Sequence, residues 1–236
     1  EDPDIRIRGT ASRYQTKPLY VVDGLWTDNI NFINPNDIES LEVLKDASSL
    51  AIFGARGANG VIIVSTKKAK TGKTTVNYST SIGVKNITGK PSLTNATQFK
   101  TLYDEQRLNQ GVAPYGAYNL FTANTDWIDT IKNQGANVMN HNISVSNGTE
   151  KNRFYMGAGY IEEEGLIENE KFKKFTFNLN NELELTDAIK IGVNLGGSDS
   201  RLPQLHSFSS ALNATPIVNP FNDILGIYNQ MPIEIG

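Results

Sequence analysis

The chain has 236 residues and a formal net charge of −3, a size that suits one or two domains. This mildly acidic balance gives no support to nucleic-acid binding, which normally requires a basic face. There is no cysteine, and the two histidines, His141 and His206, lie far apart in sequence. We therefore expect no disulfide, no metal site and no cofactor.

No run of about 18 apolar residues occurs, so no transmembrane helix is expected. The sequence opens abruptly at Glu1, without a signal peptide, and a strand-like run follows at residues 5–9. We expect the chain to be cut from a longer protein at both ends.

The residues up to about 72 predict short strands and one helix. Leu19 to Val22 has the unbroken apolar character of a buried strand and ends at the turn pair Asp23-Gly24. Further strands are expected at residues 38–45 and 61–64. With a helix between these two strands, the order predicts a small α+β unit.

The predicted helix runs from Asp46 to Phe53, with Asp46 or Ser48 as its N-cap. A run with a glycine at every third residue follows, at Gly54, Gly57 and Gly60. The dinucleotide-binding fingerprint needs a different spacing and must be followed by a helix. We therefore expect this run to end the helix and to form a turn with special backbone angles.

After about residue 72, apolar and polar residues alternate with a period of two, which is typical of strands with one apolar and one polar face. Five such strands are expected, at about residues 74–86, 140–147, 152–161, 172–185 and 188–199. Their apolar face carries Val76, Tyr78, Ile82, Phe175, Phe177, Leu179, Ile191 and Val193. Their polar face carries Asn77, Ser79, Asn178, Asn180 and Asn194.

This alternation fits two kinds of antiparallel sheet. In a soluble protein the apolar face would cover a core, and this is the commoner class. In a membrane barrel the apolar face would meet lipid and the polar face a wet lumen. The Asn, Ser, Thr and Gly of the polar face favour a barrel. So do the connections, which alternate between tight turns and long segments, as in outer-membrane barrels.

The long segment at residues 87–139 contains two predicted helices. The first spans Asn95 to Gln110 with Thr94 as its N-cap, and the second starts at Thr125 and ends at Gly135. Their apolar stripes are more typical of packing surfaces than of a cofactor site.

A later connection is acidic, with Glu162-Glu163-Glu164 followed by Glu168. Such a cluster can bind calcium, but a run of charge is more often simply solvated, and we favour the solvated interpretation. No set of residues indicates catalysis, so we do not expect an enzyme.

Several segments, in order along the chain, together resemble one family. They are Pro18 to Gly24, Asn34 to Ser48, Ala51 to Lys67, Asn124 to Trp127, His141 to Ser146 and Gly157 to Tyr160. In these runs the chain resembles the SusC/RagA-type TonB-linked receptors. Arg56 falls where the family has its plug arginine, and Phe53 stands where tyrosine is more usual.

The resemblance implies a fold and a location. It implies that residues 1–72 are the C-terminal part of an α+β plug domain. Residues 73–236 would be the first antiparallel strands and extracellular loops of a plugged β-barrel of about 22 strands. The protein would lie in the outer membrane of a Gram-negative bacterium.

The resemblance also implies a function. The expected activity is TonB-dependent import of a large nutrient, a glycan or a peptide, with the plug gating the barrel. TonB, acting through a segment outside this chain, and a SusD-like surface lipoprotein are the expected partners. A surface adhesin without transport remains an alternative, although an adhesin needs no plug. A siderophore or corrinoid receptor is a third.

The resemblance places the stretch from Leu25 to Asn34 at the extracellular side of the plug. Its candidate substrate-binding residues are Trp26, Asp28, Asn29, Asn31 and Phe32. An aromatic face with amides and a carboxylate suits both sugars and peptides. Alternatively, Trp26 and Phe32 only anchor the loop onto the plug.

The other candidate residues are structural. They are Glu39, Glu42, Arg56, Gly57 and Gly60. We expect Arg56 to bond a carboxylate, either on the barrel wall or within the plug, for example on Glu39 or Glu42.

Overall fold

The computed structural model describes residues 7, 17–46, 50–203, 207–222 and 227–228. It divides into two compact units. The first comprises Glu1–Ile82, Met139–Glu162 and Lys173–Arg201, and the second comprises Gly83–Val138, Glu163–Phe172 and Leu202–Gly236. The strand expected at residues 5–9, Ser48 and His206 lie outside the described residues.

The first unit contains a four-stranded sheet, called here the small sheet. Its strands are β1 (Leu19–Val22), β2 (Leu25–Thr27), β3 (Ile38–Leu44) and β4 (Val61–Thr66), in the order β2-β1-β4-β3. The central strands β1 and β4 pair in parallel, and the edge strands are antiparallel to them. Because the two central strands are covered on both faces, their sequences are almost continuously apolar, as predicted.

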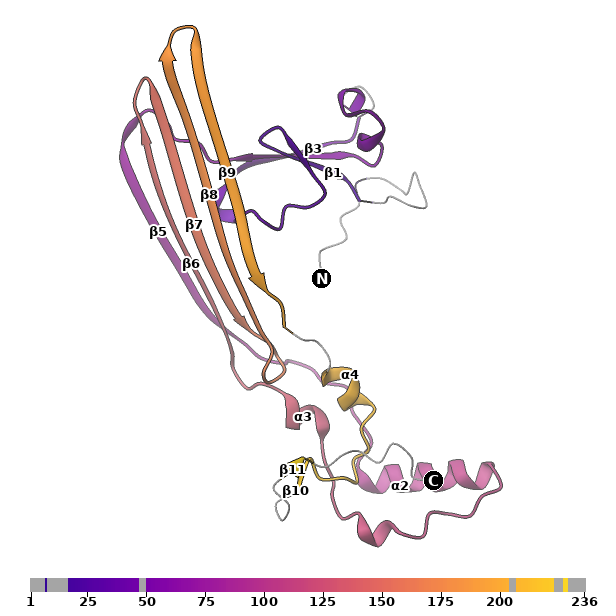
Figure 1. Cartoon of the computed structure of the whole chain (residues 1–236). Helices are drawn as coiled ribbons and strands as arrows, with labels where there is room; N and C mark the ends of the chain where they lie inside the picture. The colour runs from indigo at the N-terminus through magenta and orange to yellow at the C-terminus, as the bar shows by residue number, and fades with distance from the viewer. Residues whose placement is uncertain (1–6, 8–16, 47–49, 204–206, 223–226, 229–236) are drawn as a thin grey trace. The chain divides into compact units, whose positions relative to one another are not determined.

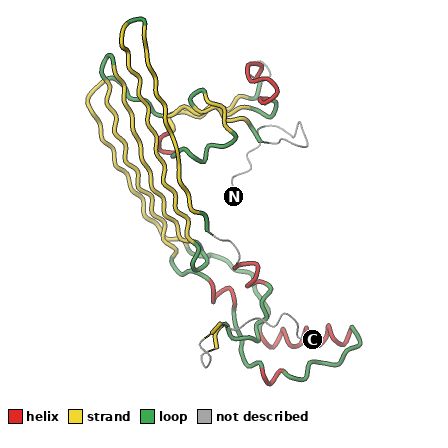
Figure 2. Tube along the Cα trace, viewed as in Figure 1, coloured by secondary structure: helices red, strands yellow, loops and turns green. Residues whose placement is uncertain are grey.

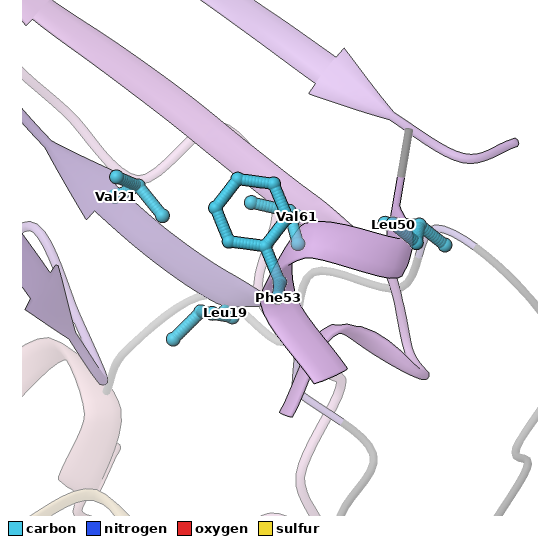
Figure 3. Close-up of a cluster of buried hydrophobic side chains, with 5 residues drawn as sticks. All are labelled: Leu19, Val21, Leu50, Phe53 and Val61. Carbon is cyan, nitrogen blue, oxygen red and sulfur yellow. The ribbon is translucent and has the colours of Figure 1, made fainter. Parts of the chain in front are cut away.

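Two apolar clusters cover the two faces of the small sheet. Successive side chains of β1 point to opposite sides, so Leu19 and Val21 enter one cluster while Tyr20 and Val22 enter the other. Figure 3 shows the first cluster, in which Phe53 lies against the strands. The α+β unit expected from the sequence is confirmed.

The segment that supplies Phe53 differs from the prediction. The 3-10 element η2 (Ala51–Gly57) is two short helices that meet at a kink at Gly54, where φ is +57°. Leu50 N donates to Asp46 O over 3.0 Å, and residues 47–49 of the expected helix lie outside the described residues. A left-handed φ suits glycine, so the first short helix ends at Gly54, as predicted, and a second one follows it.

The first unit also contains most of a five-stranded sheet, called here the large sheet. Figure 1 and Figure 2 show its long strands side by side. They follow one another in sequence order: β5 (Gly72–Lys85), β6 (Ala136–Gly148), β7 (Asn152–Glu164), β8 (Lys171–Thr186) and β9 (Ile189–Arg201). All five predicted strands are confirmed, and the largest difference is at β6, which begins four residues earlier than expected.

The two faces of the large sheet differ as the alternation predicts. Asn180 and Asn194 hydrogen-bond to the small sheet, and Asn178 is buried. On the opposite face, large apolar side chains are exposed, among them Val76, Tyr78, Ile82, Phe175, Ile191 and Val193. The polar face of the sheet is therefore the one against which the small sheet packs.

The second unit consists of the three long connections, which follow β5, β7 and β9. Its elements are α2 (Ala96–Asn109), η3 (Tyr118–Leu120), α3 (Trp127–Ile131), α4 (Ser207–Leu212), β10 (Phe221–Asn222) and β11 (Ile227–Tyr228). No helix among the described residues combines the length and apolar character needed to cross a membrane.

Both predicted helices of the second unit form, with shifted ends. Asn95 rather than Thr94 caps α2, because its side chain accepts from Gln98 N while the Gln98 side chain accepts from Asn95 N. Asp126 caps α3, which ends at Ile131 instead of continuing to Gly135.

Candidate functional site

A turn between β2 and β3 forms a buried contact between the small sheet and the large sheet. It is the 3-10 turn η1 (Pro35–Asp37) with Asn34 as its N-cap. The Asn34 side chain accepts from Asn36 N over 2.9 Å, and Pro35 at the first position fits the fixed φ of proline. This local geometry presents Asn34 and Asp37 together.

Both presented side chains bond to the large sheet. Asn34 Nδ2 donates to Asn142 Oδ1 of β6 over 2.5 Å. The Tyr155 hydroxyl of β7 donates to Asp37 Oδ1 over 2.7 Å. Asp37 is 4% exposed and Tyr155 is 5% exposed, so this second contact lies away from water.

Two glycines of β7 make room for the turn. A Cβ on Gly157 would lie 2.4 Å from Asp37 Oδ1 and 2.7 Å from Asp37 Oδ2. A Cβ on Gly159 would lie 2.0 Å from Asn34 Nδ2. Glycine within a strand often marks such a close approach. The surface of the large sheet is therefore fitted to this turn.

The environment of Asp37 favours its neutral form. Burial raises the pKa of its carboxyl, against the opposing effects of the Tyr155 hydroxyl and of the positive charge on Lys67. Asp37 Oδ2 is buried and has no hydrogen-bond partner among the described residues. An ionised carboxylate with one unsatisfied oxygen would be costly here.

Docking of the turn should therefore weaken as the pH rises. The carboxyl has an ordinary pKa of 3.8 and a higher one when docked, so docking is strongest below pH 3.8, falls through the docked pKa and then levels off. Hydrogen exchange of the amides around Asp37, corrected for intrinsic rates, measures this dependence. Asp37→Asn should flatten it, and an unchanged profile in that variant would contradict the assignment.

A second polar group joins the two sheets at the ends of β1 and β4. Asp23, which has a left-handed φ of 46°, accepts from Thr66 N over 2.9 Å and from the Thr66 hydroxyl over 2.5 Å. Asn194 Nδ2 donates to the same carboxylate over 2.8 Å. Asn180 Nδ2 donates to Thr66 Oγ1 over 2.7 Å and to Lys67 O over 3.2 Å.

Three charged side chains lie beside the contacts of Asp23. Lys68 lies 3.1 Å from Glu182, and Arg153 lies 3.6 Å from the same carboxylate. All three side chains are about half exposed, so these pairs add little to stability. They line a polar hollow of about 160 Å³ that also reaches Asp23 and Asn194.

Arg56 bonds a carboxylate in the segment that follows β2, but not one of those suggested. Its Nη2 lies 2.9 Å from Asp28 Oδ1. The suggested partners Glu39 and Glu42 are wrong: Glu39 lies 3.9 Å from Lys70, and Glu42 is exposed on β3. Both Arg56 and Asp28 are well exposed, so the pair positions the segment after β2 more than it stabilises the fold.

Trp26 is held by contacts with Phe53 and with the same Arg56 guanidinium. Its ring lies 6.0 Å from that of Phe53, and the Arg56 guanidinium lies 5.6 Å from its centroid. The expected loop in fact begins with the edge strand β2, which carries Trp26. Although it is anchored, Trp26 remains 47% exposed, so one face of a fixed ring is available.

The remaining candidates of this segment divide between surface and core. Asn29 Oδ1 accepts from Asn31 N over 3.1 Å, and both residues are exposed. Phe32 is half-buried against the second apolar cluster, which makes it an anchor.

Gly57 and Gly60 allow a close approach and a left-handed backbone angle, respectively. Gly60 has a φ of +99°, and its N–H donates to Gly57 O over 2.9 Å. A Cβ on Gly57 would lie 3.0 Å from the Cβ of Phe53.

Three carboxylates of the acidic connection bond to three different partners. Glu162 pairs with Lys173, Glu163 with Lys85, and Glu164 with the backbone and side chain of Asn137. The part of the chain that the structure describes holds no group of three metal-ligating residues.

The Asn124–Trp127 run organises the second unit. Asn124 Oδ1 accepts from Ala96 N at the start of α2. Thr125 Oγ1 donates to Val218 O over 2.7 Å, and Trp127 Nε1 donates to Thr215 O over 2.8 Å. These bonds fasten the connection after β9 to the one after β5.

Comparison with known proteins gives one family. The model of the TonB-dependent receptor plug domain matches residues 1–61. TonB-dependent receptor P3 of Formosa agariphila is 35% identical over 83% of the chain, and TonB-dependent receptor SusC of Bacteroides thetaiotaomicron is 34% identical over 75%. The chain covers 19% and 18% of these relatives, so it spans about a fifth of their length.

Solved structures of RagAB are also similar to this chain. The RagAB peptide transporter superposes with a TM-score of 0.76 at 27% identity, covering 95% of this chain and 30% of that one. The RagAB peptide importer in its closed-closed state gives a TM-score of 0.72 over 91% of this chain and 29% of that one.

Proposed function

Because the chain belongs to the SusC/RagA-type TonB-dependent receptors, we propose that the whole protein imports a large nutrient, a glycan or a peptide, across the outer membrane. The small sheet is then plug and the large sheet is barrel wall, with residues 1–72 and 73–236 as the two domains. The observation that carries the proposal is the hydrogen-bonded docking of the plug turn Asn34–Asp37 onto the polar face of the wall.

The two faces of the wall support this assignment. The polar face bonds the plug through amide and hydroxyl groups, which suit a wet lumen, whereas exposed apolar side chains cover the other face. A plug that closes the lumen has a use in gated transport, and an adhesin has no need of one.

The partners follow from the same relationship. We propose that TonB energises the import through a segment outside this chain, and that a SusD-like surface lipoprotein captures the substrate. The solved relatives are named RagAB peptide importer and RagAB peptide transporter, which supports import of a large substrate. The relatives do not decide between glycan and peptide.

The import proposal is tested in cells that produce the full receptor. Uptake of a labelled oligosaccharide pool and of a labelled peptide pool would be compared with and without TonB. Uptake of one pool that requires TonB is expected. TonB-independent surface binding without uptake would favour an adhesin, and uptake only of iron or cobalt complexes would favour the third alternative.

We further propose that Trp26 and Asn29 contact the substrate. Trp26 offers an immobilised, half-exposed ring beside the Arg56–Asp28 pair, and Asn29 lies on the surface three residues after Trp26. Trp26→Ala and Asn29→Ala should each weaken binding by about tenfold or less, which corresponds to one aromatic or hydrogen-bonding contact.

Affinity and surface expression of both variants are measured together, with Glu42→Ala as an exposed control on β3. Unchanged affinity at normal expression would reduce the segment to scaffolding. Loss of expression in Trp26→Ala alone would assign Trp26 to anchoring only.

A further inference from the structure

The plug is held to the wall by two contacts of different chemical character. The contact around Asp23 satisfies both carboxylate oxygens and borders a polar hollow. The contact around Asp37 is dry: carboxyl and phenol are both buried, and one oxygen of Asp37 is left without a partner among the described residues.

This difference determines how each contact can open. Amide and carboxylate groups beside a hollow can exchange their partners for water one bond at a time, at little cost. The Asp37–Tyr155 contact can only open when water reaches a buried carboxyl group. Once hydrated, that group gains the bonds it lacks when docked, and this favours a discrete open state.

We infer that the turn Asn34–Asp37 is the latch of the plug, and that separation of Asp37 from Tyr155 is the step that frees the plug from the wall. The inference rests on the proposed import function, in which the plug must move. Asp37 and Tyr155 act in it as positioning residues and need not touch substrate.

The close fit of the wall supports a latch rather than a general adhesive surface. Gly157 lies against both oxygens of Asp37 and has no side chain with which to follow the turn as it leaves. A short displacement of the turn is therefore enough to break the contact between Asp37 and Gly157.

The test uses the full receptor and three variants. Tyr155→Phe removes only the hydroxyl that Asp37 accepts from. Tyr160→Phe is the matched control. Tyr160 is on the same strand, its side chain points to the opposite face of the sheet, and its hydroxyl donates to Glu162. Asn180→Ala removes two hydrogen bonds from the other contact, those to Thr66 Oγ1 and Lys67 O.

Hydrogen exchange of the peptide spanning Asn34 to Leu44 is the first measurement. Loss of one buried hydrogen bond should raise the open population about tenfold, and with it the exchange rate. We expect this rise in Tyr155→Phe and none in Tyr160→Phe or, within this peptide, in Asn180→Ala. Equal protection in Tyr155→Phe and wild type would overturn the latch.

The second measurement is the leak of a large antibiotic through the outer membrane of cells with the same variants. A greater leak in Tyr155→Phe alone would support the gating role, whereas faster exchange with no leak would overturn it. Neither readout needs a substrate. If uptake fails while both effects persist, the import proposal falls and the latch remains.

Discussion

Gly159→Ala should prevent the plug from docking while leaving the barrel wall folded. The added Cβ would lie 2.0 Å from Asn34 Nδ2 and 2.7 Å from Thr176 Oγ1. Asn34 cannot retreat freely, because it caps its own turn and bonds Asn142, and Thr176 is buried and bonds the carbonyl of Gly159 itself. Overpacking of this kind costs about 1–3 kcal/mol or more, which falls here on the plug–wall contact.

Proteolysis of the plug in the assembled receptor measures this loss, and heat-modifiable migration in a gel reports whether the barrel has folded. Gly196→Ala is the matched control, because a Cβ there meets its nearest atom at 3.8 Å. Plug protection equal to wild type in Gly159→Ala would mean that the turn does not dock as described.

Leu179→Arg should impair barrel assembly far more than Ser79→Arg. Both residues lie near the middle of a strand, Leu179 on β8 and Ser79 on β5. Leu179 lies between Asn178 and Asn180, which face the plug side, so its side chain points to the apolar face. An arginine near the bilayer midplane costs about 2–4 kcal/mol.

Ser79 belongs to the opposite face, since its neighbour Tyr78 shares the outer face with His141 and bonds it over 3.0 Å. Arginine there meets the lumen. Assembly of the full receptor into the outer membrane is the measurement. Comparable assembly of the two variants would argue against a lipid-facing apolar surface. Asn180→Arg is a poor control, because Asn180 is buried against the plug.

The strands could be predicted because their signal is local. Alternation along β5, β8 and β9 depends only on which face each residue takes, so the sequence contains it directly. Helix ends are less certain: Thr94 and Asn95 are both acceptable caps, and the choice depends on Gln98 reaching back to Asn95. The kinked segment after Leu50 depends on how Phe53 packs in the first cluster.

The contacts of the candidate site could not be predicted in this way. Tyr155 and Asp37 are 118 residues apart, and no periodicity links them. Arg56 could choose among several carboxylates, and the backbone path after β2 brought Asp28 to it. The glycines did give a signal: Gly157 and Gly159 within an otherwise regular strand indicate close approach of another segment.

The order of the docking contacts along the chain bears on biogenesis. The plug comes first in sequence, and its receiving residues are Asn142 on β6, Tyr155 on β7, Asn180 on β8 and Asn194 on β9. These strands are consecutive, and two of their three connections are tight turns. Both halves of the interface are therefore present in one continuous stretch, and closing such loops costs little extra entropy as they lengthen. We expect the plug to seat on these strands while the nascent sheet is still open, so that it does not have to be threaded into a finished pore.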